Sequence, residues 1–403
     1  MAASKTLLFL GFVAICLLTG GLATEIEVRN LDPDIHLTTP QLVAKYGYPI
    51  EEHEVTTADG YILTLHRIPY GKKSPASENR PPVLLQHGLL CSSADWVVMG
   101  PEHGFGYLLA DAGYDVWLGN ARGNVYSKKH RDDITQGEYW DFSWHEMGIY
   151  DLPAVIDHIL ETTKQEKLFY AGHSMGTTMF YVMASERPEY NDKIRAMFSM
   201  APVAHMNHMQ NIFVKLIANF TDGLGVLLNL LGVNEFMPKT ELLESLGQLL
   251  CRDTAITQDI CSNILFLIAG FDSDQLNKTA LPVILGHTPA GAATKEFLHY
   301  GQTTHSKKFR KYDYGLLGNM KRYGSIHPPE YKLNKITAPV ALHYGVNDLL
   351  ADEQDTDTLS HELPNTIGKF RVAHDKFNHL DFLWAIDAKP LLYDIIIRFM
   401  GRY

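Results

Sequence analysis

The chain has 403 residues, of which 46% are hydrophobic and 20% are charged, and its formal net charge is −11. This composition is typical of a globular protein with a large core, built as one elaborated domain or as two smaller ones. The acidic balance and the absence of a long Lys/Arg block argue against nucleic-acid binding and against charge-driven binding to an anionic membrane. Beyond the N-terminal segment, no stretch of the sequence reaches the ~18 apolar residues of a spanning helix, so no transmembrane segment is predicted.

The first 23 residues have the pattern of a secretory signal peptide. Lys5 supplies the charge, residues 7–18 form the apolar run, and the Gly-Leu-Ala sequence at 21–23 predicts cleavage after Ala23. A membrane anchor is the alternative, but the apolar run is short and Thr-Gly-Gly at 19–21 breaks it. We therefore expect a protein of the secretory pathway, either secreted or delivered to lysosomes.

Four cysteines are few for a secreted chain, and Cys16 leaves with the signal. Because the secretory route is oxidising, Cys251 and Cys261 are expected to pair, which leaves Cys91 as a free thiol. Two N-x-S/T sequons predict glycosylation at Asn219 and Asn277.

The first half of the mature chain alternates between strand and helix patterns. A polar lead-in with a short helix near 39–46 precedes two strand-like runs that flank Asp59-Gly60, a strong hairpin signal. Buried-strand patterns then occupy residues 82–86, 114–118, 168–171 and 196–200. Helical patterns occupy residues 105–112, 144–160 and 175–185, with Gly113 as a C-terminal cap and Pro153 as a kink.

The alternation stops after residue 202 and resumes near the C-terminus. Residues 205–325 contain helical, amphipathic and irregular segments without a convincing buried strand, whereas strand patterns return at 338–344 and 369–372. A last helix over 382–400, kinked at Pro390, closes the chain. The pattern predicts an α/β fold: a mostly parallel sheet with helices on both faces, in two parts (24–204 and 326–403), and a helical cap inserted at 205–325.

The sequence Gly-His-Ser-Met-Gly at 172–176 lies between the 168–171 strand and the 175–185 helix. In that context G-x-S-x-G predicts a serine on a sharp strand-to-helix turn, with its hydroxyl exposed and a helix N-terminus facing the site. A Gly/Ser-rich turn without chemistry is the alternative. We take Ser174 as a candidate nucleophile.

A serine nucleophile needs a base, and the base needs an acid that orients it. In doubly wound hydrolases these groups follow in the order Ser, acid, His, on loops beyond the strands. Asp348 and His379 fit this order, ahead of His361 and His374. Three other acids, Asp352, Asp355 and Asp357, are expected on a solvated helix face, and Asp381 is a possible support for His379 or the backbone.

An oxyanion hole needs two backbone donors aimed at the developing charge. Met175 follows the nucleophile and Leu89 follows His87-Gly88 after the 82–86 strand, so their N–H groups are the candidates. The predicted reaction is a two-step acyl transfer from an ester to Ser174 and then to water. No metal-ligand spacing is apparent, and neither a metal nor a cofactor is expected.

The inserted segment suggests the substrate. Residues 211–233 are very apolar for a segment outside the sheet, although Lys215, Asp222 and two glycines exclude a clean membrane span. One interpretation is that they pack the cap onto the core. The other is that they form a mobile lid that covers an acyl site and meets a lipid surface, and the two interpretations are compatible. We expect a monomer that binds lipid esters at a lipid–water interface.

Together these motifs resemble the acid lipase family, the group of gastric lipase and lysosomal acid lipase, over nearly the whole mature chain. The resemblance implies an α/β-hydrolase core with a helical cap and lid, hydrolysis of triacylglycerols or sterol esters, and Ser174, Asp348 and His379 as the triad. Cys251 and Cys261 align with a family disulfide, although the loop length differs slightly and some relatives carry a further cysteine at the place of Ala269. The segments that carry the resemblance are LQHGLL at 85–90, DAGYDVWLGN at 111–120, YDLPA at 150–154, GHSMGTT at 172–178, GVNDLLA at 345–351 and NHLDF at 378–382.

Three rival hypotheses remain at this point. A short-chain carboxylesterase would share the chemistry, and the apolar insert disfavours it. A non-catalytic lipid-binding or storage protein on a lipase scaffold predicts a broken triad, whereas all three members are present. A peptidase of the same fold is disfavoured because nothing in the cap suggests peptide recognition.

Overall fold

The structure is a computed structural model, and it describes residues 32–77, 79–218, 232–239 and 258–403. Asp34–Tyr403 form one compact unit, to which all of the elements below belong. The predicted signal peptide, Asn219 and Cys251 lie outside the described residues. None of the helices in the described ranges combines the length and the hydropathy that spanning a membrane requires.

A mixed sheet forms the centre of this unit, in the order β1-β2-β4-β3-β6-β7-β10-β11, with the short β5 paired to β2. The strands from β4 to β11 run parallel, and β1 and β2 are antiparallel additions at one edge. Side chains of β3, β4, β6 and β10 are all buried, as expected for strands covered on both faces. The strands are β1 Glu51–Thr56, β2 Tyr61–Ile68, β3 Pro82–Gln86, β4 Asp115–Leu118, β5 Lys129–His130, β6 Leu168–His173, β7 Ile194–Met200, β10 Val340–Tyr344 and β11 Thr366–Arg371.

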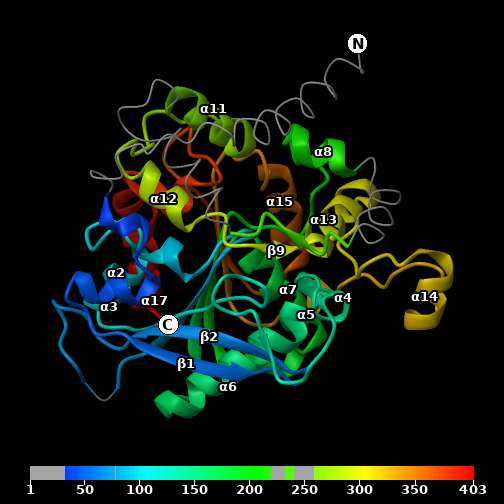
Figure 1. Cartoon of the computed structure of the whole chain (residues 1–403), viewed down its shortest axis with the longest axis horizontal. Helices are drawn as coiled ribbons and strands as arrows, with labels where there is room; N and C mark the ends of the chain where they lie inside the picture. Colours follow the sequence, from blue (N-terminus) through cyan, green and yellow to red (C-terminus); the bar gives the residue numbers. More distant parts are fainter. Residues whose placement is uncertain (1–31, 78, 219–231, 240–257) are drawn as a thin grey trace, which may run out of the picture. The chain divides into compact units, whose positions relative to one another are not determined.

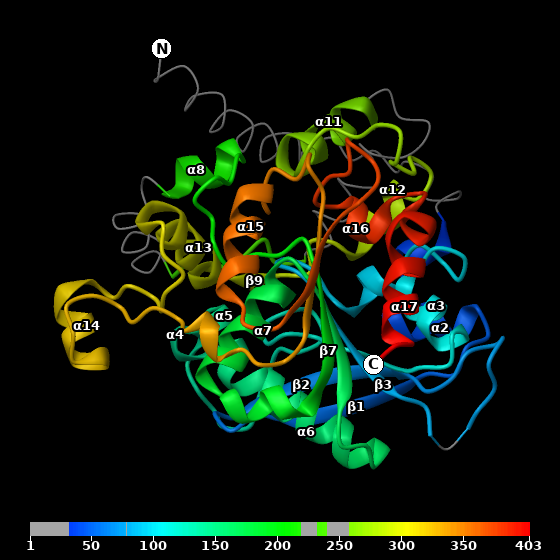
Figure 2. The same cartoon turned by 180° about the vertical axis from the view of Figure 1, so that it is seen from behind.

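Helices cover both faces of the sheet, which confirms the predicted α/β-hydrolase architecture. Helices α3 and α17 lie on one side of the sheet, and α6 and α7 lie on the other (Figures 1 and 2). The helices of this core are α2 Thr39–Lys45, α3 Phe105–Asp111, α4 Gln136–Tyr139, α5 Trp144–Glu146, α6 Leu152–Thr163, α7 Met175–Glu186, α15 Glu353–Glu362, α16 Asp381–Trp384 and α17 Asp394–Met400.

The sequence predicted two long helices with a kink at a proline, and in the structure each of them is divided into shorter elements. A π-helical turn, Met147–Asp151, joins α5 to α6, so the structure has a widened turn just before Pro153, where the sequence predicted a kink. The predicted helix over 382–400 is wrong at Ala385, whose extended backbone pairs with Leu276 of the inserted segment before a second π-helical turn, Lys389–Tyr393. A tertiary contact therefore ends the helix, and no residue pattern near Ala385 predicts this end.

Strand β11 begins three residues before the predicted run at 369–372. It is an edge strand whose side chains are half-buried, so it lacks the continuous apolar run that marks the central strands. The parallel pairing of β11 with β10 still places the loop after β11 beside the loop after β10.

The inserted segment is mostly helical in its described part, and it also holds two short strands that the sequence did not predict. Strands β8 Glu235–Phe236 and β9 Ala292–Ala293 pair with each other outside the main sheet. Two residues give too short a pattern to recognise from the sequence. The helices are α8 Ile212–Ala218, α11 Gln258–Ala269, α12 Leu281–His287, α13 Thr294–Ser306 and α14 Gly315–Tyr323.

Candidate active site

Ser174 occupies a strained turn between β6 and α7. Its backbone has φ 51° and ψ −116°, a conformation that non-glycine residues rarely adopt. The flanking glycines allow the turn to pack closely: a Cβ on Gly176 would lie 2.3 Å from the Gln86 carbonyl oxygen. A Cβ on Gly172 would lie 2.8 Å from the Gly176 carbonyl carbon. Only glycine fits at both positions, as the sequence motif predicts.

The structure brings Ser174, His379 and Asp348 together from three separate strand ends. His379 Nε2 lies 2.8 Å from Ser174 Oγ, and His379 Nδ1 lies 2.8 and 3.0 Å from the two Asp348 carboxylate oxygens. A carboxylate only accepts hydrogen bonds, so Nδ1 carries the proton and Nε2 is the free base that faces the serine hydroxyl. The arrangement allows proton transfer from Ser174 to His379, with Asp348 orienting the ring.

Both partners of Ser174 are buried and tied to backbone. Asp348 Oδ1 also accepts the N–H groups of Leu350 and Ala351, each at 2.8 Å. His379 is held on its main chain by a bond from His173 Nε2 to its carbonyl oxygen at 2.9 Å. The ring of His173 also packs against that of His379, with centroids 4.9 Å apart. Burial lowers the pKa of His173 well below its usual range, so this ring stays neutral.

The loop after β3 approaches the nucleophile closely. A Cβ on Gly88 would lie 3.2 Å from Ser174 Cβ. His87 fixes this loop, because its Nδ1 donates to the Gly88 carbonyl oxygen at 2.8 Å and its Nε2 accepts the Ala121 N–H at 3.0 Å. Burial lowers the pKa of His87 to about 4, which keeps the ring neutral and this bonding pattern intact.

The two candidate oxyanion donors flank Ser174. Met175 is the first residue of α7, where a helix leaves its N–H groups unpaired, and Leu89 lies in the turn after β3. Among the described residues, no backbone bond uses the N–H group of either one. Both donors are therefore available to a ligand.

The alternative acids and histidines bind partners other than Ser174. The expectation that Asp352 and Asp355 lie on a solvated helix face is wrong: both are buried. Asp352 caps α15 by accepting the Gln354 N–H, and Asp355 binds the ring and backbone of His208. The sequence pattern alone missed the contact of Asp355 because its partner, His208, lies in the inserted segment. His361 donates to the Asp357 carbonyl oxygen within α15.

Cys91 is a buried free thiol in the loop after β3, as predicted. Burial, together with the adjacent Asp95, raises its pKa well above the usual range, so the thiol is unreactive. The pairing of Cys251 with Cys261 stays a prediction because Cys251 is not described. Asn277 lies half-buried in a turn before α12, where its Oδ1 accepts the Ala280 N–H at 3.1 Å.

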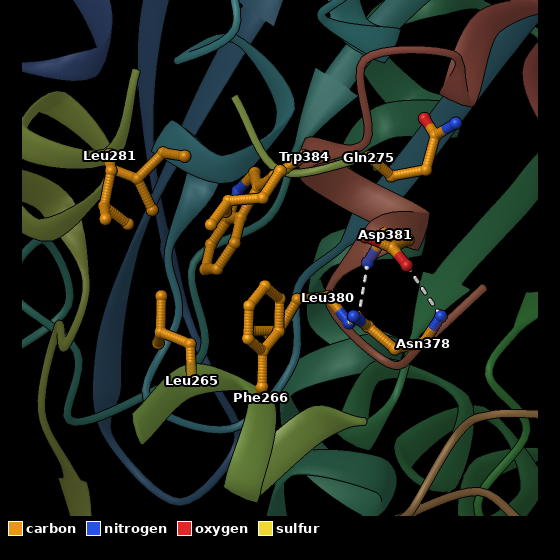
Figure 3. Close-up of a pocket in the computed structure, with 10 residues that line it drawn as sticks. Leu265, Phe266, Gln275, Leu281, Asn378, Leu380, Asp381 and Trp384 are labelled. Atoms are coloured by element: carbon orange, nitrogen blue, oxygen red, sulfur yellow. Dashed lines mark hydrogen bonds between the residues drawn. The ribbon is translucent and has the colours of Figure 1, made fainter. Parts of the chain in front are cut away.

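A small, mostly apolar pocket lies beside the loop of His379 (Figure 3). Leu380, Asp381 and Trp384 approach it from the loop and α16, and Leu265 and Phe266 approach it from α11. Across the described ranges, no three or more His, Cys, Asp or Glu side chains gather in a way that would hold a metal ion.

The site has three features: a serine on a strained strand-to-helix turn, an imidazole bonded to that serine, and a carboxylate bonded to the imidazole. Together they define the α/β-hydrolase class. Family comparisons agree: residues 39–100 match a partial alpha/beta-hydrolase lipase region, and residues 81–233 match the alpha/beta hydrolase fold. A crystal structure of a lipase candidate from Acinetobacter baumannii has the same fold, with a TM-score of 0.52 at 14% identity over 93% of this chain and 98% of that one.

Comparison with similar proteins identifies the family within this class. Lipase 3 of Drosophila melanogaster is 47% identical over 89% of this chain and 91% of its own length. Gastric triacylglycerol lipase of Mus musculus is 41% identical over 95% of each chain. Human lysosomal acid lipase/cholesteryl ester hydrolase is 38% identical over 98% of this chain and 99% of its own. The chain therefore belongs to the acid lipase family, and it is a carboxylic ester hydrolase of the lipase type that acts on lipid esters.

Proposed function

We propose that this protein is a secretory-pathway serine lipase that hydrolyses triacylglycerols, sterol esters or both through Ser174, His379 and Asp348. The single observation that supports it most is the 2.8 Å contact between His379 Nε2 and Ser174 Oγ, with Asp348 at 2.8 Å behind the ring. The names of the mouse and human relatives supply the two substrate classes.

The reaction has two steps. Ser174 Oγ attacks the ester carbonyl carbon as its proton passes to His379 Nε2, and Asp348 stabilises the imidazolium that forms. The N–H groups of Leu89 and Met175 bind the negative oxygen of the tetrahedral intermediate, aided by the N-terminus of α7. His379 then protonates the departing alcohol oxygen, which leaves the fatty acyl group esterified to Ser174.

Water completes the cycle. His379 takes a proton from a water molecule, whose oxygen attacks the acyl carbon. The second tetrahedral intermediate then collapses as the imidazolium returns the proton to Ser174 Oγ, which releases the fatty acid and restores the neutral His379. The strained φ of 51° at Ser174 holds Oγ out of the turn, where both the base and the acyl group reach it. Residues 211–233 are proposed as the lid, of which the structure describes 211–218 and 232–233, and the exposed Ile212 of α8 suits a lipid contact.

The protein is also proposed to enter the secretory pathway by its first 23 residues, to carry glycans at Asn219 and Asn277, and to act as a monomer with the cap formed by residues 205–325. The relatives named for gastric and lysosomal lipases support this route.

A substrate panel tests the proposal. Wild-type protein and Ser174→Ala are compared on a soluble short-chain ester, emulsified triolein and cholesteryl oleate, at acidic and near-neutral pH. We expect wild-type turnover of a long-chain substrate and no turnover by the variant. Hydrolysis of the soluble ester alone would favour a short-chain carboxylesterase. Equal release of fatty acid by both proteins would refute the assignment of Ser174.

A further inference from the structure

Residues 269–272, which begin at the last residue of α11 in the inserted segment, bind the loops of both Asp348 and His379. The Ala269 carbonyl oxygen accepts the Leu349 N–H at 3.2 Å and the His379 N–H at 3.4 Å. The next two carbonyl oxygens accept side-chain amides from the same loops: Gly270 from Asn378 at 3.0 Å, and Phe271 from Asn347 at 2.9 Å. One short segment therefore holds the acid and the base at once.

This segment ends in a pair of buried carboxyl groups. The side chain of Asp272 is fully buried, Asp381 is 5% exposed, and the two carboxyl groups are hydrogen-bonded to each other. A carboxylate only accepts hydrogen bonds, so two carboxyl groups bond only when one of them carries a proton. The pair therefore holds one proton between two oxygens.

The surrounding donors show which residue carries that proton. Asp272 accepts the Asp274 N–H on Oδ1 at 3.1 Å and His374 Nε2 on Oδ2 at 2.6 Å, so both of its oxygens act as acceptors. Asp381 accepts the Asn378 N–H on Oδ2 at 2.7 Å (Figure 3). Asp272 is thus the carboxylate and Asp381 the acid. Burial first, and then the charges of Asp272 and Asp348, raise the pKa of Asp381 to about 8.

We propose that the protonated Asp381, bonded to Asp272, is a positioning residue that holds the His379 loop within reach of Ser174. Asp381 and Asn378 form a reciprocal pair around His379, because Asn378 Oδ1 also accepts the Leu380 and Asp381 N–H groups at 2.8 and 3.2 Å. The proposal rests on the role proposed above for His379 as the base. It predicts an enzyme that loses activity when the shared proton leaves.

The charged groups around Asp272 and Asp381 determine how loss of the shared proton would change the site. His374 faces Asp272 from the loop after β11, and Asp348 faces Asp381 from the loop after β10. Asp274 and Lys376 form an exposed ion pair at 2.8 Å on the outer side. Loss of the proton would place two carboxylates in contact, with Asp348 as a third negative charge nearby. Repulsion would then move residues 378–381 and lengthen the bond between His379 and Ser174.

Replacement of Asp381 by asparagine tests the idea, because asparagine imitates the protonated acid at every pH. Its oxygen can accept the Asn378 N–H while its amide donates to Asp272. The kcat for a soluble short-chain ester is measured from acid to alkaline pH for wild type, Asp381→Asn and the exposed control Asp387→Asn. One pH unit above the pKa, only about a tenth of Asp381 stays protonated, so wild type and control should lose about tenfold in kcat. Asp381→Asn should keep its activity there.

Asp272→Asn provides a second variant that also removes the shared proton. Its amide would face the Asp274 or His374 N–H group, so we expect lower kcat at all pH values but again no alkaline loss. Thermal unfolding of each protein separates misfolding from altered positioning. An alkaline decline in folded Asp381→Asn or Asp272→Asn equal to that of wild type would overturn the inference. Wild-type turnover no greater than that of Ser174→Ala would instead overturn the proposed function on which it rests.

Discussion

The buried Glu296 of α13 makes the stability of this protein depend on pH in a way that a single substitution can isolate. Its side chain is fully buried, Oε1 accepts the Ala293 N–H at 2.6 Å, and among the described residues Oε2 has no hydrogen-bond partner. Burial raises the pKa of Glu296 from its usual value of 4.5 to about 8. We predict that Glu296→Gln stabilises the protein at neutral pH and leaves it unchanged in acid.

The size of this effect follows from linkage between protonation and folding. The pKa is higher in the folded state, so the stability from the neutral carboxyl is complete below the unfolded pKa and is lost as the pH rises toward about 8. Each pH unit between the two values costs about 1.4 kcal/mol, so wild type loses about 3 kcal/mol between about pH 5 and about pH 7.5. Glutamine stays neutral at every pH, so the Glu296→Gln variant does not lose this part of its unfolding free energy.

Denaturant unfolding at these two pH values measures the difference. Glu161→Gln, at an exposed position of α6, is the matched control and should follow wild type at both. The buried histidines titrate equally in all three proteins, so their contribution cancels in the comparison. Equal unfolding free energies of wild type and Glu296→Gln at about pH 7.5 would show that Glu296 is not held as a neutral acid.

Three further substitutions test the site and its supports. Asp348→Asn should lower kcat on a soluble ester by about 10³- to 10⁴-fold with unchanged thermal unfolding, because the ring of His379 loses its carboxylate; a loss below tenfold would contradict the assignment. Gly176→Ala should cost more than ~2 kcal/mol in denaturant unfolding, because its methyl carbon would lie 2.3 Å from the Gln86 carbonyl oxygen; wild-type stability would show that β3 and α7 can separate. Arg122→Met should cost about 3 kcal/mol in the same assay, because Asp59 and the buried Asp151 lose a guanidinium at 2.6–2.9 Å; an unchanged midpoint would show that solvent reaches both acids.

The sequence allowed prediction of the parts of the fold that local patterns encode. The strand before Ser174, the glycines on either side and the helix after it follow from the turn itself, and the hairpin follows from Asp59-Gly60. Chain order and distance from strand ends were sufficient to select Asp348 and His379 among nineteen histidines and many acids. In a parallel sheet, residues just beyond strand ends meet at one edge, so order along the chain becomes proximity in space.

Contacts with the inserted segment could not be predicted in the same way. The break at Ala385 depends on Leu276, and the burial of Asp355 depends on His208. The bond from the His379 N–H group to the Ala269 carbonyl oxygen and the contact between Asp272 and Asp381 join residues about a hundred positions apart without any periodic signal. Such contacts depend on how the insert packs on the core, which the pattern of either part does not encode.

The release of fatty acid by wild-type protein and by Ser174→Ala, measured side by side on emulsified triolein, tests the central claim most directly. The account predicts steady release by wild type and at least about 10³-fold less by the variant, because alanine has no oxygen to form the acyl-enzyme. Thermal unfolding at the same temperature for both would show that the loss is chemical. Equal release by the two proteins would contradict the account.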